Sequence, residues 1–126
     1  MGKNKIAGHV ILIVEDDFSS RLYLNKILEK SGAEIFNATD GREAFDLVMQ
    51  NQNIELVLMD IQLPLIDGYT CTKMIRETGR KVIIIAQTAY GLTGDKEKMM
   101  ASGFDDYLIK PISQNNLLEK ISSFFP

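Results

Sequence analysis

The stretch LVLMDIQLPLIDGY, residues 56–69, begins like a buried strand and stops at an acidic residue. Residues 56–59 are four consecutive apolar residues, a pattern typical of a strand that is covered on both faces. Asp60 follows at once, and Pro64 and the pair Asp67-Gly68 then indicate a loop. A single aspartate at a strand end commonly satisfies loop backbone, so its meaning depends on how the other strands end.

Length and composition predict one ordinary globular domain. The chain has 126 residues, of which 45% are apolar and 25% charged. This length and composition are sufficient for a hydrophobic core that needs no disulfide or structural metal ion. The net charge of −3, without a run of lysine or arginine, argues against a nucleic-acid or anionic-membrane surface. The single cysteine, Cys71, excludes an internal disulfide and fits a reducing compartment. No membrane span and no signal peptide is apparent, so the sequence predicts a cytoplasmic protein.

Strand-like and helix-like patterns alternate along the chain. Apolar runs typical of strands occupy residues 10–14, 34–38, 56–59, 82–86 and 106–109. Apolar residues at helical spacing lie between them, on faces formed by Leu24, Ile27 and Leu28, by Ala44, Leu47 and Val48, by Cys71, Met74 and Ile75, and by Leu117, Ile121, Phe124 and Phe125. Five strands alternating with five helices predict an α/β fold, with a parallel sheet between two layers of helices.

Capping residues mark the ends of several of these helices. Ser113 is a candidate N-cap of the last helix, and Asp40 with Glu43 three residues later resembles a capping box. Helices are expected to stop at three glycines, namely Gly32, Gly79 and Gly103.

Polar residues follow four of the five predicted strands. These strand ends carry Glu15-Asp16-Asp17, Asp60, Thr88-Ala89 and Lys110-Pro111. In a parallel α/β sheet such ends lie on one edge, where ligands bind. Each residue alone has a structural explanation, as a helix cap, a loop residue or a solvated lysine. Their common position predicts a functional site.

Three carboxylates at one sheet edge need protons or a cation. Two carboxylates about 4 Å apart repel each other by about 4 kcal/mol at an effective dielectric constant of 20. An all-oxygen site suits Mg²⁺ better than Zn²⁺, and the only histidine, His9, precedes the first strand. A metal ion and Lys110 facing a carboxylate could neutralise a phosphoryl group during transfer, with Asp60 as the nucleophile.

Four motifs, ILIVEDD, LVLMDIQLPLIDG, IIIAQTAY and DDYLIKPI, follow one another over residues 10–125. In this order and at these separations the chain resembles the receiver domains of two-component response regulators. The resemblance implies a flavodoxin-like (βα)5 three-layer sandwich, whose five-stranded parallel sheet has the order 2-1-3-4-5. It also implies a phosphoacceptor domain in a two-component or phosphorelay pathway.

The resemblance assigns roles to the strand-end residues. Asp60 would accept a phosphoryl group from a phosphohistidine on a sensor histidine kinase or a histidine phosphotransfer protein. Mg²⁺, or Mn²⁺ in its place, would be held by Asp16, Asp60, the backbone carbonyl of Gln62 and, through water, Glu15. Lys110 would contact the phosphoryl oxygens, and a cis peptide bond would join it to Pro111.

The resemblance further implies a conformational switch and a control of phosphate lifetime. Thr88 would turn toward the phosphoryl group and Tyr107 would move inward. The readout face would comprise the fourth helix, fifth strand and fifth helix, residues 91–125. Gln62 and Tyr90 would flank the water that hydrolyses the aspartyl phosphate, and we expect the bulky Tyr90 to slow that water's entry.

Three other functions compete with this interpretation. A flavodoxin-like electron carrier needs a hydroxyl-rich phosphate loop, where Glu15-Asp16-Asp17 would repel the phosphate. Mg²⁺-dependent phosphatases with an aspartate nucleophile resemble one another in a second Asp, two residues after the nucleophile, that acts as general acid. This chain has Gln62 at that position, which argues against a phosphatase. A receiver-like docking module without phosphorylation is the third alternative, and the full set of site residues argues against it.

The predicted organisation is an N-terminal extension, residues 1–8, and a receiver domain, residues 9–126, without a DNA-binding or enzymatic effector. Such a domain promotes its own phosphorylation and dephosphorylation but is not a stand-alone turnover enzyme. The segments DIQLPLIDG and GDKEKMMASGFDDYLIKPI are most similar to receivers attached to hybrid sensor histidine kinases. A stand-alone relay protein and a domain of a hybrid kinase both remain open, as do the cognate kinase and the output.

Overall fold

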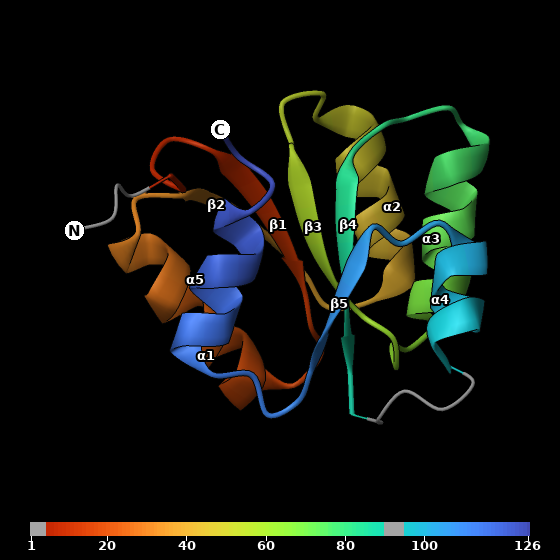
Figure 1. Ribbon diagram of the computed structural model, residues 1–126. Coiled ribbons are helices and arrows are strands. Elements are labelled where there is room, and N and C mark those ends of the chain that lie inside the picture. The colour runs from red at the N-terminus through yellow and green to blue at the C-terminus, as the bar shows by residue number, and fades with distance from the viewer. Residues whose placement is uncertain (1–4, 90–94) are drawn as a thin grey trace.

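Strands and helices alternate strictly along the chain in the computed structural model, which describes residues 5–89 and 95–126 (Figure 1). The strands are β1 (Val10–Val14), β2 (Glu34–Ala38), β3 (Leu56–Asp60), β4 (Ile83–Thr88) and β5 (Asp106–Ile109). The helices are α1 (Phe18–Lys30), α2 (Gly41–Gln50), α3 (Gly68–Glu77), α4 (Asp95–Ser102) and α5 (Gln114–Ser122).

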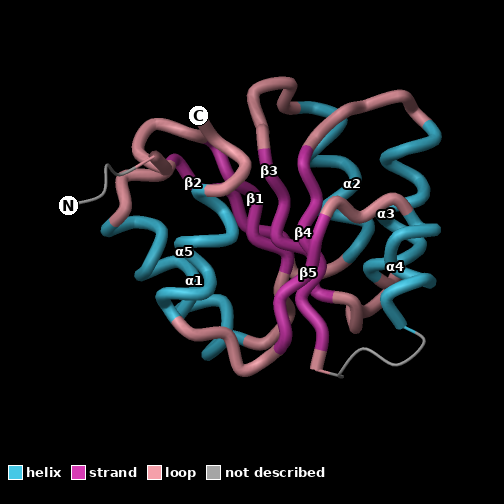
Figure 2. The backbone as a smooth tube through the Cα atoms, viewed as in Figure 1, coloured by secondary structure: helices cyan, strands magenta, loops and turns pink. Residues whose placement is uncertain are grey.

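The five strands form one parallel sheet in the order β2-β1-β3-β4-β5. Helices α1 and α5 lie on one side of it, and α2, α3 and α4 lie on the other (Figures 1 and 2). This confirms the predicted three-layer α/β fold and its strand order. Because β1 and β3 are covered on both faces, every residue of each is buried.

Each face of the sheet has its own hydrophobic core. On the α1/α5 side, Ile11, Ile13 and Leu58 pack with helix residues that include Leu28 and Ile121. On the opposite side, apolar residues of β1, β3 and β4 pack against helices α2, α3 and α4, through Ala44, Val48, Cys71, Ile75 and Met99. The alternation of side chains along each strand distributes them between the two cores.

Two strands are longer than the apolar runs that predicted them. β3 includes Asp60, and β4 extends over Ile83–Thr88 instead of residues 82–86. Asp60 pairs with Gln87, and Thr88 pairs with Ile109. Ladder hydrogen bonds use backbone groups, so polar side chains at the ends of these strands do not end the pairing.

The predicted helix ends are confirmed, with one difference at α2. The backbone has positive φ at Gly32, Gly79 and Gly103, and Ser113 caps α5 by accepting a hydrogen bond from the Asn116 N–H. Asp17, Asp40 and Asp67 are the N-caps of α1, α2 and α3.

At α2, only one half of the expected capping box forms. Asp40 accepts from the Glu43 N–H at 2.7 Å, whereas the Glu43 carboxylate accepts from the N–H of Thr39, one residue before the cap. The Glu43 side chain therefore ties down the strand-to-helix turn as well as the helix start.

The single histidine has a structural role. His9 Nδ1 lies 2.9 Å from Glu55 Oε1, and the His9 ring stacks on Phe125 with 3.8 Å between the ring centroids. Ile6, three residues earlier, is buried in the core on the α1/α5 side. These contacts tie the segment before β1 to the end of the described chain. None of the helices that the structure describes combines the length and apolar composition of a membrane span.

Candidate functional site

The carboxyl ends of β1, β3 and β5 bring two buried carboxylates to one lysine. Glu15 directly follows β1, Asp60 ends β3, and Lys110 directly follows β5. The Lys110 Nζ atom lies 3.2 Å from Glu15 Oε1 and 3.1 Å from Asp60 Oδ2. Glu15 is 1% exposed and Asp60 is 5% exposed. The convergence of these residues at one sheet edge is the arrangement that the strand ends predicted.

A third carboxylate completes an acidic group that could hold a metal ion. One carboxylate oxygen from each of Glu15, Asp16 and Asp60 lies within 4.8 Å of the other two. Asp16 is exposed, so the group is buried on one side and open to solvent on the other. An all-oxygen donor set with room for water fits a hard divalent cation such as Mg²⁺. The donor set of this chain therefore suits the Mg²⁺ that the sequence predicts at this sheet edge.

Burial and neighbouring charges shift the pKa values of Glu15 and Lys110. Burial, together with the nearby Asp60 carboxyl group, raises the pKa of Glu15 to about 7. Burial alone would lower the pKa of Lys110, but hydrogen bonds and attraction from Asp60 and Glu15 outweigh it and raise that pKa. Without a metal ion, Lys110 is thus the cation that neutralises this buried acidic pair.

Backbone groups position the carboxylates further. The Gln62 N–H donates to Asp60 Oδ1 at 3.1 Å, and the Asp17 N–H donates to Glu15 Oε2 at 3.2 Å. Asp17 itself caps α1 by accepting from the Ser20 N–H, and this hydrogen bond lowers the pKa of Asp17. The third acid of the EDD sequence therefore begins the helix and leaves the first two for the site.

The loop after β3 packs too closely for side chains at two glycines. A Cβ atom on Gly68 would collide with the backbone carbonyl oxygen of Asp60 and with Ile61 Cα. One on Gly41, at the start of α2, would collide with the Ile66 carbonyl oxygen. These two contacts press the loop between Asp60 and α3 against the ends of β3 and α2.

The two residues of the predicted switch lie on one face of the sheet. Ala86 pairs with Tyr107, and Thr88 lies two residues after Ala86 on β4. Side chains two apart on a strand share a face, so Thr88 and Tyr107 both face the side covered by α2, α3 and α4. Thr88 is buried, and Tyr107 is half-buried against the core of that side. The switch itself stays a prediction.

The remaining predicted residues fall in and around the site. The Lys110-Pro111 peptide bond is cis, as the resemblance implied, and the Lys110 N–H donates to the Thr88 carbonyl at 2.7 Å. The Gln62 side chain is exposed beside Asp60. Tyr90 lies outside the described residues, as do residues 91–94 of the expected readout face.

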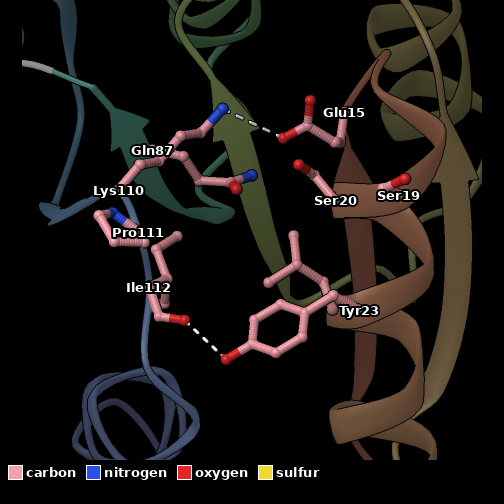
Figure 3. A pocket seen from close by; sticks show the side chains of 9 residues that line it. Glu15, Ser19, Ser20, Tyr23, Gln87, Lys110, Pro111 and Ile112 are labelled. Atoms are coloured by element: carbon pink, nitrogen blue, oxygen red, sulfur yellow. Dashed lines mark hydrogen bonds and ion pairs between the residues drawn. The ribbon is translucent and has the colours of Figure 1, made fainter.

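Two features near the site had been missed from the sequence. Gln87, inside the apolar run of β4, is buried beside Glu15 and Lys110 in one cavity. The Tyr23 hydroxyl donates to the Ile112 carbonyl at 2.7 Å and links α1 to the segment after β5 (Figure 3). A glutamine within IIIAQT was a visible signal, because a polar residue there interrupts a buried strand. The contact between Tyr23 and Ile112 left no signal in the sequence.

Comparisons with known proteins agree with this geometry. A family model described as the response regulator receiver domain matches residues 11–122. The chain is 38% identical over 121 residues to hybrid signal transduction histidine kinase I of Dictyostelium discoideum. That match covers 90% of this chain but 7% of the relative, so this chain corresponds to a small part of that kinase.

Two solved structures are similar over nearly the whole chain. One is the receiver domain of a Pseudomonas aeruginosa sensor histidine kinase with a magnesium ion in its active-site cleft; it is 36% identical with a TM-score of 0.83, over 94% of this chain and 98% of that one. The other is the receiver domain of a Saccharomyces cerevisiae response regulator, crystallised with a histidine phosphotransfer protein. It is 31% identical with a TM-score of 0.89, over 95% of this chain and 90% of that one.

The family match extends from β1 to the last residue of α5, and so includes every strand end that contributes to the acidic group. The fold, the strand order and the paired carboxylates and lysine all follow the pattern that the resemblance implied. The chain therefore belongs to the response regulator receiver domains, which act in two-component signalling.

Proposed function

We propose that Asp60 accepts a phosphoryl group from a phosphohistidine of a partner protein in a Mg²⁺-dependent reaction. The observation that carries this proposal is that Asp60 contacts Lys110 and lies within 4.8 Å of the carboxylate oxygens of Glu15 and Asp16. In the transfer, an Asp60 carboxylate oxygen forms a bond to phosphorus while the bond from phosphorus to the histidine nitrogen breaks. The leaving imidazole stays with the partner.

In this proposal the acidic residues bind Mg²⁺, and Lys110 together with the ion neutralises the phosphoryl oxygens. Asp16, Asp60 and the Gln62 backbone carbonyl would bind Mg²⁺, and Glu15 would act through water; Mn²⁺ is an alternative ion. The metal, when bound, supplies positive charge to the phosphoryl oxygens. Lys110 already bonds to Asp60, so a small displacement of its Nζ atom would move it from the carboxylate to the new phosphoryl group.

Phosphorylation would then be read out through Thr88 and Tyr107. The loss of negative charge at the Asp60 carboxylate and the gain of phosphoryl oxygens favour a Thr88 hydroxyl that points toward the site. Tyr107, on the same face, would fill the space that Thr88 leaves. Gln62, exposed beside Asp60, would orient the water that ends the signal. We also propose that Tyr90 slows the entry of that water.

A histidine phosphotransfer protein or a sensor histidine kinase is the proposed partner. The start of α1 offers a surface for it, because Phe18, two residues after Asp16, is 67% exposed and Leu22 on the next turn is also exposed. An apolar patch beside the phosphoryl site suits a partner that must bring its histidine to Asp60. The yeast receiver domain described above was crystallised with such a protein, which supports this choice.

Phosphoryl transfer itself tests the proposed function. Purified protein is incubated with a histidine phosphotransfer protein that carries radiolabelled phosphohistidine, with Mg²⁺ or with excess EDTA. We expect one base-labile phosphoryl group to reach this chain in Mg²⁺ and almost none in EDTA. Acetyl phosphate serves as a donor that needs no docking, which separates chemistry from partner choice. Absence of label with both donors in Mg²⁺ would favour a docking module without phosphorylation.

Mg²⁺ binding is expected to depend on pH through Glu15. Because the folded pKa of Glu15, about 7, exceeds its ordinary value of 4.5, the metal-free protein loses stability from this group as the pH rises between these values. Mg²⁺ competes with the bound proton, so its affinity should increase about tenfold from pH 6 to pH 8. Isothermal titration calorimetry in two buffers of different ionisation enthalpy measures both affinity and proton release. The Glu15→Gln variant should lose most of this dependence; an equal slope in both proteins would contradict the assignment.

A further inference from the structure

The cavity that contains Gln87 lies next to the phosphoryl site, between α1 and the segment that follows β5, and shares Glu15 and Lys110 with that site. It has a volume of about 470 Å³, which is within the size range of small-molecule sites. Its walls are formed by Glu15, Ser19, Ser20, Tyr23, Leu24, Gln87, Lys110, Pro111 and Ile112 (Figure 3). It lies on the α1/α5 side of the sheet, whereas Thr88 and Tyr107 face the opposite side.

Gln87 supplies the cavity with a buried carboxamide. The residue is 1% exposed, and neither its Nε2 nor its Oε1 atom has a hydrogen-bond partner in the part of the chain that the structure describes. Figure 3 shows this carboxamide extending from β4 toward Ser20 on α1, across the cavity. A buried amide without partners costs free energy, because its hydrogen bonds to water are lost on folding and not replaced. A ligand in the cavity would replace them.

The other walls restrict the chemical class of that ligand. Leu24, Pro111 and Ile112 present apolar surface, and the Tyr23 ring lies along the α1 side with its hydroxyl already bonded to the Ile112 carbonyl. The charges of Glu15 and Lys110 are paired with each other at one end. The cavity therefore offers no unpaired charge to an ion. Among the lining residues that the structure describes, it offers the buried donor and acceptor pair of Gln87 and the hydroxyls of Ser19 and Ser20, beside apolar walls.

We propose that this cavity is a binding site for a small neutral molecule with a planar apolar body and an amide-type edge. A primary amide, a lactam or a nucleobase edge presents one donor beside one acceptor. Such an edge can form two parallel hydrogen bonds with a glutamine carboxamide, as glutamine does with adenine. Binding at this site does not require Asp60 to be phosphorylated, so the proposal is independent of the function proposed above.

Titration with benzamide, followed by two-dimensional ¹H–¹⁵N NMR, tests the site directly. Benzamide has the planar body and the complementary carboxamide, and N,N-dimethylbenzamide keeps the body but has no N–H donor. We expect benzamide to shift the backbone amide signals of residues 19–24, of Lys110 and of Ile112, and the side-chain amide signal of Gln87. N,N-dimethylbenzamide should bind about tenfold more weakly, because one of two hydrogen bonds is lost.

Two variants separate hydrogen bonding from apolar contact. Gln87→Met keeps the side-chain volume and removes the carboxamide. It should reduce benzamide affinity about a hundredfold, because both hydrogen bonds are lost, and N,N-dimethylbenzamide affinity about tenfold, because its one remaining hydrogen bond is lost. Gln50→Met makes the same substitution at an exposed position of α2, on the other side of the sheet, and should change neither affinity. Equal binding of benzamide to wild type and Gln87→Met, or no shift at the cavity residues up to its solubility limit, would overturn the proposal.

The thermal stability of Gln87→Met provides a second readout. If the carboxamide has no partner in the unliganded protein, its removal should raise the Tm by roughly 3 °C. A lower Tm in Gln87→Met would mean that ordered water or another contact already satisfies Gln87. The amide would then have a structural role, and the proposal of a ligand that pairs with it would be overturned.

Discussion

Asp60→Asn is expected to abolish phosphorylation by acetyl phosphate and by a phosphohistidine donor, with a loss of at least about a hundredfold in rate. The asparagine amide keeps the shape of the side chain but is not a nucleophile for phosphorus. It also removes one negative charge from the metal site and from the contact with Lys110. Intact-protein mass spectrometry, which counts the phosphoryl groups on each chain, measures the result.

A matched control makes this loss specific to Asp60. Asp17→Asn changes the same functional group two residues after Glu15, and asparagine caps helices as well as aspartate does, so α1 should be retained and labelling should stay near that of wild type. Since Asp60 helps to raise the pKa of Glu15, that pKa should fall in Asp60→Asn, which NMR of the Glu15 carboxyl carbon can follow. Full labelling of Asp60→Asn would refute Asp60 as the acceptor.

Lys110→Ala is expected to have the second large effect, on both stability and phosphorylation. It leaves the buried Glu15 and Asp60 without their neutralising cation, which should cost about 2–4 kcal/mol in the free energy of unfolding at pH 8 without metal. The cost should be smaller near pH 5, because the raised pKa of Glu15 lets it take up a proton there. Urea unfolding at the two pH values measures this difference.

Mg²⁺ should separate the structural and chemical roles of Lys110. In Lys110→Ala a competing positive charge is gone, so Mg²⁺ affinity should equal or slightly exceed that of wild type, and saturating Mg²⁺ should recover part of the stability. Phosphorylation or its conformational readout should remain impaired, because the ion cannot replace the contact of lysine with the phosphoryl oxygens. Lys26→Ala, on the exposed face of α1, is the control. Wild-type behaviour of Lys110→Ala in both assays would reduce Lys110 to a solvated strand-end residue.

Local patterns were enough to predict the architecture of this domain. The central strands β1 and β3 coincide with unbroken apolar runs, because a parallel sheet between two helical layers buries both faces of its inner strands, whereas the edge strands β2 and β5 are only partly buried. Strand ends were less predictable: residues 82–86 of the expected fourth strand became Ile83–Thr88, since the ladder continues through Gln87 and Thr88. Helix α4 has no long apolar stripe, and within its described side chains Met99 supplies the apolar contact with the core.

The charged part of the site was predictable for a topological reason. Glu15, Asp60 and Lys110 follow different strands, and a parallel sheet brings such positions together whatever the details of side-chain packing. Gln87 was not predictable in the same way. Whether its carboxamide is paired depends on distances to α1 and to the segment after β5, which no short stretch of sequence encodes. The sequence shows a polar residue within a buried strand, but its lack of a partner among the described residues and its position in the cavity follow from tertiary packing.

The two glycines that hold the loop after β3 have a consequence for interpreting mutational scans. Any side chain at Gly68 or Gly41 would displace backbone that supports Asp60, although neither residue offers a functional group to a phosphoryl group or a metal ion. In a saturation library selected for signalling, both positions should be depleted as strongly as Asp60 itself. Depletion alone would then not distinguish residues needed for folding from the residue that accepts the phosphoryl group. Folded-protein abundance, measured in parallel for each variant, would tell the two apart: Asp60 variants should accumulate, and Gly68 and Gly41 variants should not.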